Sequence, residues 1–382
     1  MNIFNSLGSN YNLNFVFKSL FAAGSRQDKK ALEDFLNEKF DGKTLLLYKG
    51  RQAIEIALKL LDLPKTSVVA INGFTCFAVY QAVINAGLSV DYIDIEKGDL
   101  NFSPNQLRNK LKGNPDIKVI IIQNTLGYPA QVEEIATICK ENNIILIEDL
   151  AHSVGGKFGD FVALSFSQDK LIDAISGGAL ICKNKKYNFD NLEEKDEIKD
   201  RLYPLLTYVI RNTYSFGPGK IIHKILKILD LLSKPMDENL AFSTIAPWYC
   251  NLIKEEFDNL ENNLNRRRKI ASIYSQNIDQ KILFSRLVKN IPNSTNLRFP
   301  IFVENRASLI SFLKKQNIFV SDIWYDAPIA PKKYMLQTDY NHQCPNAEKI
   351  SEIILNLPTH KNVSEKDAVQ ISQLINQWIK QQ

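Results

Sequence analysis

Short segments that are apolar along both faces recur through the first half of the chain, and helix-like segments separate them. Residues 116–124 (DIKVIIIQN) and 144–150 (IILIEDL) are of this apolar kind. The segments 51–63 and 133–143 instead carry apolar residues at the spacing of a helix face. Strands that are apolar on both faces and alternate with helices are typical of a mostly parallel sheet covered on each side. We therefore predict an α/β domain over about residues 26–200.

The character of the sequence changes beyond residue 200. We divide the chain into an N-terminal arm (1–25), a large domain (26–236) with an apolar and basic helical insertion at about 201–236, and a small C-terminal α+β domain (237–382). In the small domain we expect a long helix over 247–278, a strand near 297–303, and helices near 308–317 and 366–380.

Composition narrows the class of protein without identifying it. The chain of 382 residues is 45% hydrophobic and carries a net charge of +5, and its lysines and acids are interspersed, so we expect no nucleic-acid partner. The five cysteines form no CxxC pair, which fits reduced thiols better than a disulfide framework, and we assign no metal ligands. The sequence shows neither a signal peptide nor an apolar run long enough to span a membrane. We expect a cytoplasmic protein.

The segment Lys49–Gln52 opens a helix directly after a strand-like run. In open α/β sheets, ligands bind beyond the carboxyl ends of the strands. The free N–H groups and the dipole of a helix start bind phosphate, which makes Gly50, Arg51 and Gln52 candidates for a phosphate site. The alternative is an ordinary helix start after a turn glycine.

Two acids, Glu148 and Asp149, end a strand that is otherwise wholly apolar. A carboxylate at this position suits a buried cation such as a protonated pyridine nitrogen, which Asp149 can hold. The alternative for Asp149 is a cap for the residues that follow. His152, three residues further on, either packs against a flat ring or completes a hydrogen-bonded core.

Lys170 follows Ser165 and precedes the pair Gly177–Gly178, between two strand-like runs. An isolated loop lysine is usually a solvated surface residue. This setting, however, suits a lysine that forms a Schiff base with an aldehyde whose phosphate is bound by Ser165. A phosphate site, an acid and a lysine in one α/β domain are the parts that a pyridoxal 5′-phosphate (PLP) enzyme needs.

These residues resemble the DegT/DnrJ/EryC1/StrS family of PLP-dependent sugar aminotransferases. The matching block is IEDLAHSVGGKFGDFVALSFSQDK, followed by SGG at 176–178. GRQAIEIAL resembles the family's phosphate-loop helix, and CPNAEKISEIILNLPTH resembles its C-terminal pattern. The resemblance implies the aspartate-aminotransferase fold (PLP-dependent transferase fold type I) and a homodimer whose active sites lie at the subunit interface.

The resemblance also implies roles for individual residues. Lys170 would bind PLP covalently and move the proton between the substrate carbon and the cofactor. Asp149 would hold the pyridine nitrogen, Ser165 and the Gly50–Gln52 turn would bind the phosphate, and His152 would lie near the ring. The implied reaction transfers an amino group, usually from glutamate, to a keto group on a nucleotide-linked sugar in surface-polysaccharide or glycan biosynthesis.

Two regions depart from the family pattern. The residue that stacks on the ring in many relatives falls at Cys76, with Phe74 and Phe77 close by. The stretch that helps relatives bind their substrate falls on the apolar segment 201–236, so the acceptor stays open. Two alternatives follow: a membrane-surface protein of this fold that acts on or binds a lipid-linked or apolar acceptor, and a regulator without turnover.

Residues 217–235 predict an amphipathic helix bracketed by Pro218 and Pro235. Isoleucines and leucines cover one side of this helix, and three lysines lie on the other side. Two alternatives remain open: the helix packs on the core, or it makes a peripheral contact with an anionic membrane.

Overall fold

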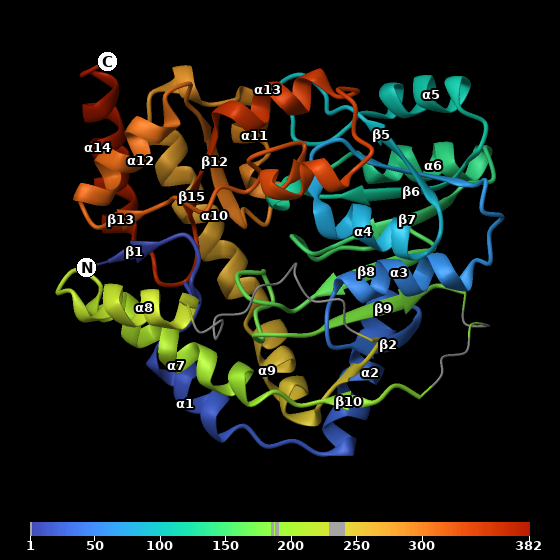
Figure 1. Cartoon of the computed structure of the whole chain (residues 1–382), viewed down its shortest axis with the longest axis horizontal. Helices are drawn as coiled ribbons and strands as arrows, with labels where there is room; N and C mark the ends of the chain where they lie inside the picture. The colour runs from blue at the N-terminus through green and yellow to red at the C-terminus, as the bar shows by residue number, and fades with distance from the viewer. Residues whose placement is uncertain (1, 185–186, 188–190, 229–240) are drawn as a thin grey trace.

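A seven-stranded sheet forms the centre of the large domain (Figure 1). The computed structural model describes residues 2–184, 187, 191–228 and 241–382. In spatial order the strands are β2 (Lys43–Leu47), β9 (Gly178–Cys182), β8 (Phe161–Ser165), β7 (Ile145–Asp149), β6 (Ile117–Gln123), β3 (Val68–Asn72) and β5 (Ser89–Ile93). The expected α/β class, with a mostly parallel sheet, is confirmed.

Strand β9 is the exception to the parallel arrangement, because it runs antiparallel to both β8 and β2. The connection from β8 to β9 spans residues 166–177 and contains no helix. A parallel pair needs a crossover of a dozen or more residues, usually a helix, whereas an antiparallel pair needs only a loop. The helix-free loop between β8 and β9 therefore reverses the chain and carries Lys170.

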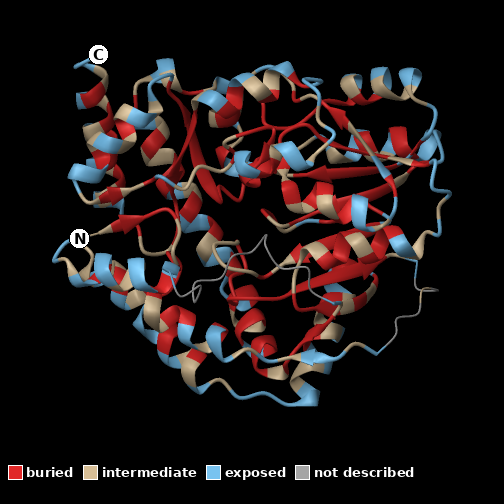
Figure 2. Cartoon of the chain, viewed as in Figure 1, coloured by how far each residue is buried: buried red, intermediate tan, exposed pale blue. Residues whose placement is uncertain are grey.

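Helices cover both faces of the sheet, as the apolar strands require. On one face α3 (Arg51–Leu60) and α4 (Phe77–Asn85) pack in one core cluster with the side chains of Ile121 and Ile147. The opposite face, which presents Ile120 and Leu146, is covered by further helices. These are α2 (Arg26–Phe40), α5 (Pro104–Gly113) and α6 (Val132–Glu141). Figure 2 shows the sheet as a continuous buried layer between them.

The helix expected over 247–278 is in fact two helices, α9 (Pro247–Asp258) and α10 (Leu260–Asn277), which meet at Asn259. Helix α9 packs on α2 in the core of the large domain. Helix α10 leads into a second core, where it packs on α14 (Glu365–Ile379).

The C-terminal core is built around two antiparallel strands, β12 (Arg298–Phe302) and β15 (Ile354–Pro358). Helix α12 (Arg306–Lys315) lies in the same core, and α13 (Pro345–Ile353) leads into β15. The short elements nearby are α11 (Ser285–Lys289) and β13 (Ile318–Phe319). The expected strand and helices of a smaller α+β unit are present at these places.

The N-terminal arm does not stand apart from the rest of the chain. Its strand β1 (Ile3–Phe4) pairs in parallel with β13 of the C-terminal unit. Its helix α1 (Leu13–Phe21) packs on α7 (Ile198–Thr213), which in turn packs on α8 (Pro218–Ile228). Of the helix expected over 217–235, the part beyond Ile228 lies outside the described residues.

Two further pairs of two-residue strands are present. Strand β10 (Glu194–Lys195) pairs with β11 (Thr244–Ile245), and β4 (Thr75–Cys76) pairs with β14 (Ile329–Ala330). Within the described ranges, every helix falls short of the combination of length and apolar character that crossing a membrane requires.

Candidate active site

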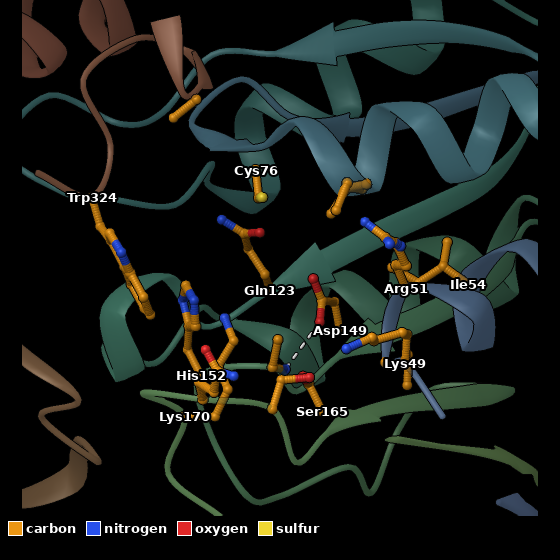
Figure 3. A pocket seen from close by; sticks show the side chains of 18 of the residues that line it. Lys49, Arg51, Ile54, Cys76, Gln123, Asp149, His152, Ser165, Lys170 and Trp324 are labelled. Carbon is orange, nitrogen blue, oxygen red and sulfur yellow. Dashed lines mark hydrogen bonds between the residues drawn. The ribbon is translucent and has the colours of Figure 1, made fainter. Parts of the chain in front are cut away.

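A cavity of about 360 Å³ opens at the carboxyl ends of the parallel strands, where open α/β sheets bind ligands. Its lining brings together six of the seven predicted site residues, namely Gly50, Arg51, Asp149, His152, Ser165 and Lys170. Figure 3 shows Asp149, Ser165 and Lys170 directed toward the same space. The seventh, Gln52, is buried beside the cavity and donates from Nε2 to the carbonyl oxygen of Ala241 at 2.9 Å.

Asp149 is the last residue of β7 and faces the cavity. Its Oδ1 accepts a hydrogen bond from the backbone N–H of Ala151 at 3.0 Å, so the capping interaction considered from the sequence is also present. Burial raises the pKa of Asp149, while the Ala151 N–H and the charge of Lys170 oppose that shift. The buried carboxyl group is therefore stabilised as an anion only when positive charge lies close to it.

The neighbouring acid, Glu148, points to the opposite face of the sheet, since side chains alternate along a strand. Its Oε1 accepts hydrogen bonds from the backbone N–H groups of Phe158 at 2.8 Å and Gly159 at 2.6 Å. Glu148 thus holds a turn in place. Of the two acids, Asp149 therefore lines the cavity, and Glu148 stabilises the turn before β8.

Lys170 lies in the loop between β8 and β9, and its Nζ is 4.6 Å from the centroid of the Trp324 ring. Burial in the cavity lowers the pKa of Lys170, and the Asp149 carboxylate opposes this shift. The residue before it, Asp169, has a φ of 62°, and Gly177 at the end of the loop has a φ of 117°. Ile175 has a φ of 75° as well, and three residues in the left-handed region make this loop a tightly specified one.

A buried carboxylate, Asp173, fixes the conformation of this loop. It accepts hydrogen bonds from Tyr11 Oη at 2.7 Å, from Asn10 Nδ2 at 2.8 Å and from the backbone N–H of Asp169 at 2.8 Å. The N-terminal arm therefore reaches across the molecule and positions the segment that carries Lys170. The sequence analysis assigned the arm no such role, because only the folded chain brings residues 10 and 170 together.

Three backbone segments meet at the other end of the cavity. A Cβ atom added to Gly50 would lie 2.6 Å from Ser165 Cβ, and one added to Gly178 would lie 2.4 Å from Gly50 Cα. The start of α3, the end of β8 and the start of β9 therefore touch without side chains between them. The Gly177–Gly178 pair in the sequence is explained by this close approach together with the positive φ of Gly177.

His152 lines the cavity and is also buried and hydrogen-bonded, as one of the two alternatives from the sequence expects. Its Nδ1 accepts a hydrogen bond from the backbone N–H of Leu126 at 3.2 Å. Its ring stacks on Trp324, with 5.2 Å between ring centroids and 19° between the planes (Figure 3). Burial lowers the pKa of His152 well below its usual value, so the ring is neutral at neutral pH.

The residues that close the cavity from the C-terminal unit were not predicted from the sequence. Asp322, Trp324 and Tyr325 line it from the segment 322–331, which the pairing of β14 with β4 brings into place. Gln123, opposite Asp149 in the β6–β7 register, was missed as well. A polar residue that ends an apolar strand was a usable signal for Gln123, as it was for Asp149.

Of the three residues considered for stacking on the cofactor ring, Cys76, Phe74 and Phe77, only Cys76 lines the cavity. Cys76 lines the cavity, whereas Phe74 packs edge-on against Tyr325 at 5.2 Å and Phe77 stacks on Tyr334 at 4.8 Å. Neither phenylalanine belongs to the cavity lining. The aromatic side chains that line the cavity are His152, Trp324 and Tyr325 instead.

The residues present fit PLP. A lysine amine and a carboxylate share one cavity, and Gly50, Arg51 and Ser165 line it at the start of α3, where a helix start suits a phosphate. The model of the DegT/DnrJ/EryC1/StrS aminotransferase family matches residues 27–191 and 245–376. The chain belongs to this family. It is a PLP-dependent aminotransferase, and the predicted family, cofactor and enzyme class are confirmed.

Relatives of known activity match most of the chain. It is 26% identical over 338 residues to UDP-4-amino-4,6-dideoxy-N-acetyl-beta-L-altrosamine transaminase of Campylobacter jejuni, covering 85% of this chain and 82% of the relative. It is 24% identical to dTDP-4-amino-4,6-dideoxy-D-glucose transaminase of Shigella dysenteriae, covering 85% and 81%. Helicobacter pylori PseC, an aminotransferase involved in the biosynthesis of pseudoaminic acid, has a similar fold, with a TM-score of 0.71, 15% identity and 100% of both chains covered.

Proposed function

We propose that this enzyme transfers an amino group from glutamate to the keto group of a nucleotide-linked sugar in glycan biosynthesis, in the cytoplasm. The observation that carries the proposal is the placement of Lys170 and Asp149 in one cavity, next to the start of α3. The named relatives, which are transaminases of nucleotide sugars, support the class of acceptor.

We propose the following roles for the chain's own residues. PLP, when bound, supplies the electron sink that stabilises negative charge at the carbon bearing the amino group. Lys170 Nζ would move the proton between that carbon and the cofactor, and its lowered pKa leaves more of the amine neutral, as a base must be. The Asp149 carboxylate keeps the pyridine nitrogen protonated, because a protonated ring nitrogen relieves the cost of burying the anion.

We propose that the remaining predicted residues bind the cofactor phosphate or orient the cofactor ring. Ser165, Gly50 and Arg51 hold the phosphate at the start of α3, where N–H groups and the helix dipole favour an anion. His152, neutral and stacked on Trp324, gives the cavity a flat apolar surface for the ring. Gln52 contributes to the same turn through its backbone, since its side chain binds Ala241.

The test is product analysis after incubation with PLP, glutamate and a panel of keto-sugar nucleotides. We expect 2-oxoglutarate and an amino sugar nucleotide, detected by mass spectrometry. Visible absorbance that borohydride removes, and that Lys170→Ala lacks, would separately report the covalent link to the cofactor. Absorbance without turnover of any sugar nucleotide would contradict the acceptor class but not the cofactor site.

We also propose that the active enzyme is a homodimer and that it touches a membrane through α8. The dimer rests on the fold, because subunits of this fold type share their active sites. Light scattering at assay concentration tests it, and a fully active monomer would contradict it. The membrane contact would also allow a lipid-linked acceptor, so lipid-linked keto sugars belong in the panel of acceptors.

A further inference from the structure

Large apolar side chains that remain exposed are concentrated on three helices. Among the described residues, ten of the thirteen large exposed apolar side chains lie on α1, α7, α8 or the short link between α7 and α8. They are Leu13, Phe17, Phe21, Ile198, Leu202, Val209, Phe216, Ile221, Ile225 and Ile228. The exposure is large, reaching 83% for Phe216 and 72% for Ile228. We call these ten residues the apolar helical face.

The apolar helical face is one surface rather than scattered residues. Helix α7 packs between α1 and α8, and Figure 1 shows the three helices in a row along one edge of the molecule. In α8 the exposed positions 221, 225 and 228 repeat at the spacing of one helix face, as do 13, 17 and 21 in α1. The buried side of α8 is formed by Gly219 and Leu226. The helix packs on the protein with that side and leaves its isoleucines uncovered.

The charged residues of α8 all have the same sign. Lys220, Lys224 and Lys227 precede the three exposed isoleucines of α8 by one position each and are exposed themselves. Helices α1 and α8 contain no acidic residue. The single acid of α7, Asp200, is buried and accepts hydrogen bonds from Tyr48 Oη and Tyr249 Oη, both at 2.8 Å. The surface therefore combines exposed isoleucine and phenylalanine with exposed lysine.

None of these three helices belongs to the part of the chain that matches the family. The match covers residues 27–191 and 245–376, whereas the helices occupy 13–21, 198–213 and 218–228. Neither the sheet nor the cavity requires a face of this composition. Contiguous exposed apolar patches on soluble proteins mark sites of interaction.

We infer that the apolar helical face binds the surface of a membrane that contains anionic phospholipid. An in-plane helix that inserts apolar side chains between headgroups and places lysines beside the phosphates uses this combination of residues. A second copy of the chain is a poorer occupant, because a two-fold interface would bring the three lysines of α8 toward those of the partner subunit. The inference rests on the membrane contact proposed for α8, extends it to α1 and α7 and to anionic phospholipid, and stands whichever sugar is the acceptor.

The test is co-sedimentation of the PLP-loaded enzyme with phosphatidylcholine vesicles, with and without phosphatidylglycerol, at low and high salt. We expect binding to the phosphatidylglycerol vesicles at low salt, weakened at high salt. Replacing the three lysines of α8 by Gln should lower the partition coefficient by about 100-fold at low salt. Replacing its three exposed isoleucines by Ser should lower it by about tenfold for each side chain that inserts.

The matched control variants make the same kinds of substitution at exposed positions outside the apolar helical face. Leu336→Ser removes an apolar side chain that is 99% exposed, and Lys314→Gln with Lys315→Gln removes two exposed lysines of α12. These controls should bind vesicles as the unaltered enzyme does. Amino transfer to a soluble acceptor, measured on every variant, should be unchanged, so a failed membrane test is distinct from a failed assignment of the reaction.

Two results would overturn the inference. One is a lack of binding to phosphatidylglycerol vesicles at low salt by the unaltered enzyme. The other is an isoleucine variant that binds vesicles normally but loses its native oligomeric state in light scattering, which would assign the face to contact between subunits.

Discussion

The two sides of the active-site cavity are built in different ways. We call one side the cofactor wall; its residues are Gly50, Asp149, Ser165 and Lys170. They lie at the ends of strands of a single sheet, or in the helix start and the loop next to those strands. The other side, the roof, is the segment 322–331, which reaches the cavity through a pairing of two residues in each strand, β14 with β4. The wall is rigid because the whole sheet supports it. The roof depends on a few contacts, so we expect the chemistry in the wall and substrate selection in the roof.

The largest effect should come from the wall. Lys170→Ala removes the amine that we propose moves the proton, and we expect kcat to fall by about 10⁴-fold or more. Lys157→Ala, at an exposed position in the turn that follows β7, is the control and should leave kcat unchanged. Thermal unfolding of both variants should resemble that of the unaltered enzyme. Near-normal turnover by Lys170→Ala would remove the basis for placing the chemistry in the wall.

The adjacent acids give the next comparison. Asp149→Asn leaves the ring nitrogen without an anionic partner, and losing a charged hydrogen bond of about 1.5–3 kcal/mol should lower kcat by roughly 10- to 200-fold. Glu148→Gln is the matched variant on the opposite face of the sheet. It weakens the bonds to the N–H groups of Phe158 and Gly159, so it should lower the unfolding free energy by about 1–3 kcal/mol and spare kcat.

Steady-state kinetics at saturating PLP, together with urea unfolding, separate these two outcomes. If Asp149→Asn lost only cofactor affinity and recovered full turnover with added PLP, its role in the chemical step would be refuted.

The roof should respond less strongly. Trp324→Ala removes the ring that stacks on His152 and lies beside Lys170, and we expect kcat/KM for the acceptor to fall by about tenfold. Trp324→Phe keeps an aromatic ring and should recover most of the activity. A loss in Trp324→Ala as large as that in Lys170→Ala would mean that the roof takes part in the chemistry.

The smallest effect concerns the support of the lysine loop by the N-terminal arm. Asn10→Ala removes a hydrogen bond to the buried carboxylate of Asp173, so we expect a loss of about 2 kcal/mol in unfolding free energy. Because Asn10 positions the loop without lining the cavity, kcat should fall a few-fold and the KM of both substrates should stay unchanged. Asn14→Ala, at an exposed position of α1, is the control. An effect confined to KM would contradict a positioning role.

Most of the wall was predictable from the sequence, because the alternation of apolar strands and helices along the chain is a local property. A polar residue that is the last residue of an apolar strand lies where the carboxyl ends of the parallel strands meet. Asp149 is found at this place. The reversal of β9 was not specified, since an apolar strand reads the same in both directions. The break at Asn259 was missed because apolar spacing continues through it on both sides.

The roof and the arm were not predictable for a different reason. Trp324 reaches the cavity through strands as short as two residues, which leave no periodic pattern. Asn10 and Tyr11 act on Asp173, more than 160 residues away in sequence, and short polar segments of this kind resemble ordinary termini. In both cases the contact joins segments that are far apart in the chain. Neither segment has a sequence pattern that predicts the contact.

The close approach of Gly50, Ser165 and Gly178 has a consequence for altering this enzyme in the laboratory. A side chain at Gly50 or Gly178 would collide with main-chain or Cβ atoms that cannot yield without moving strands of the sheet. Mutant libraries aimed at new acceptors should therefore leave these positions untouched and vary residues 322–331. Selections that do so would keep the cofactor in place while they explore the shape of the entrance.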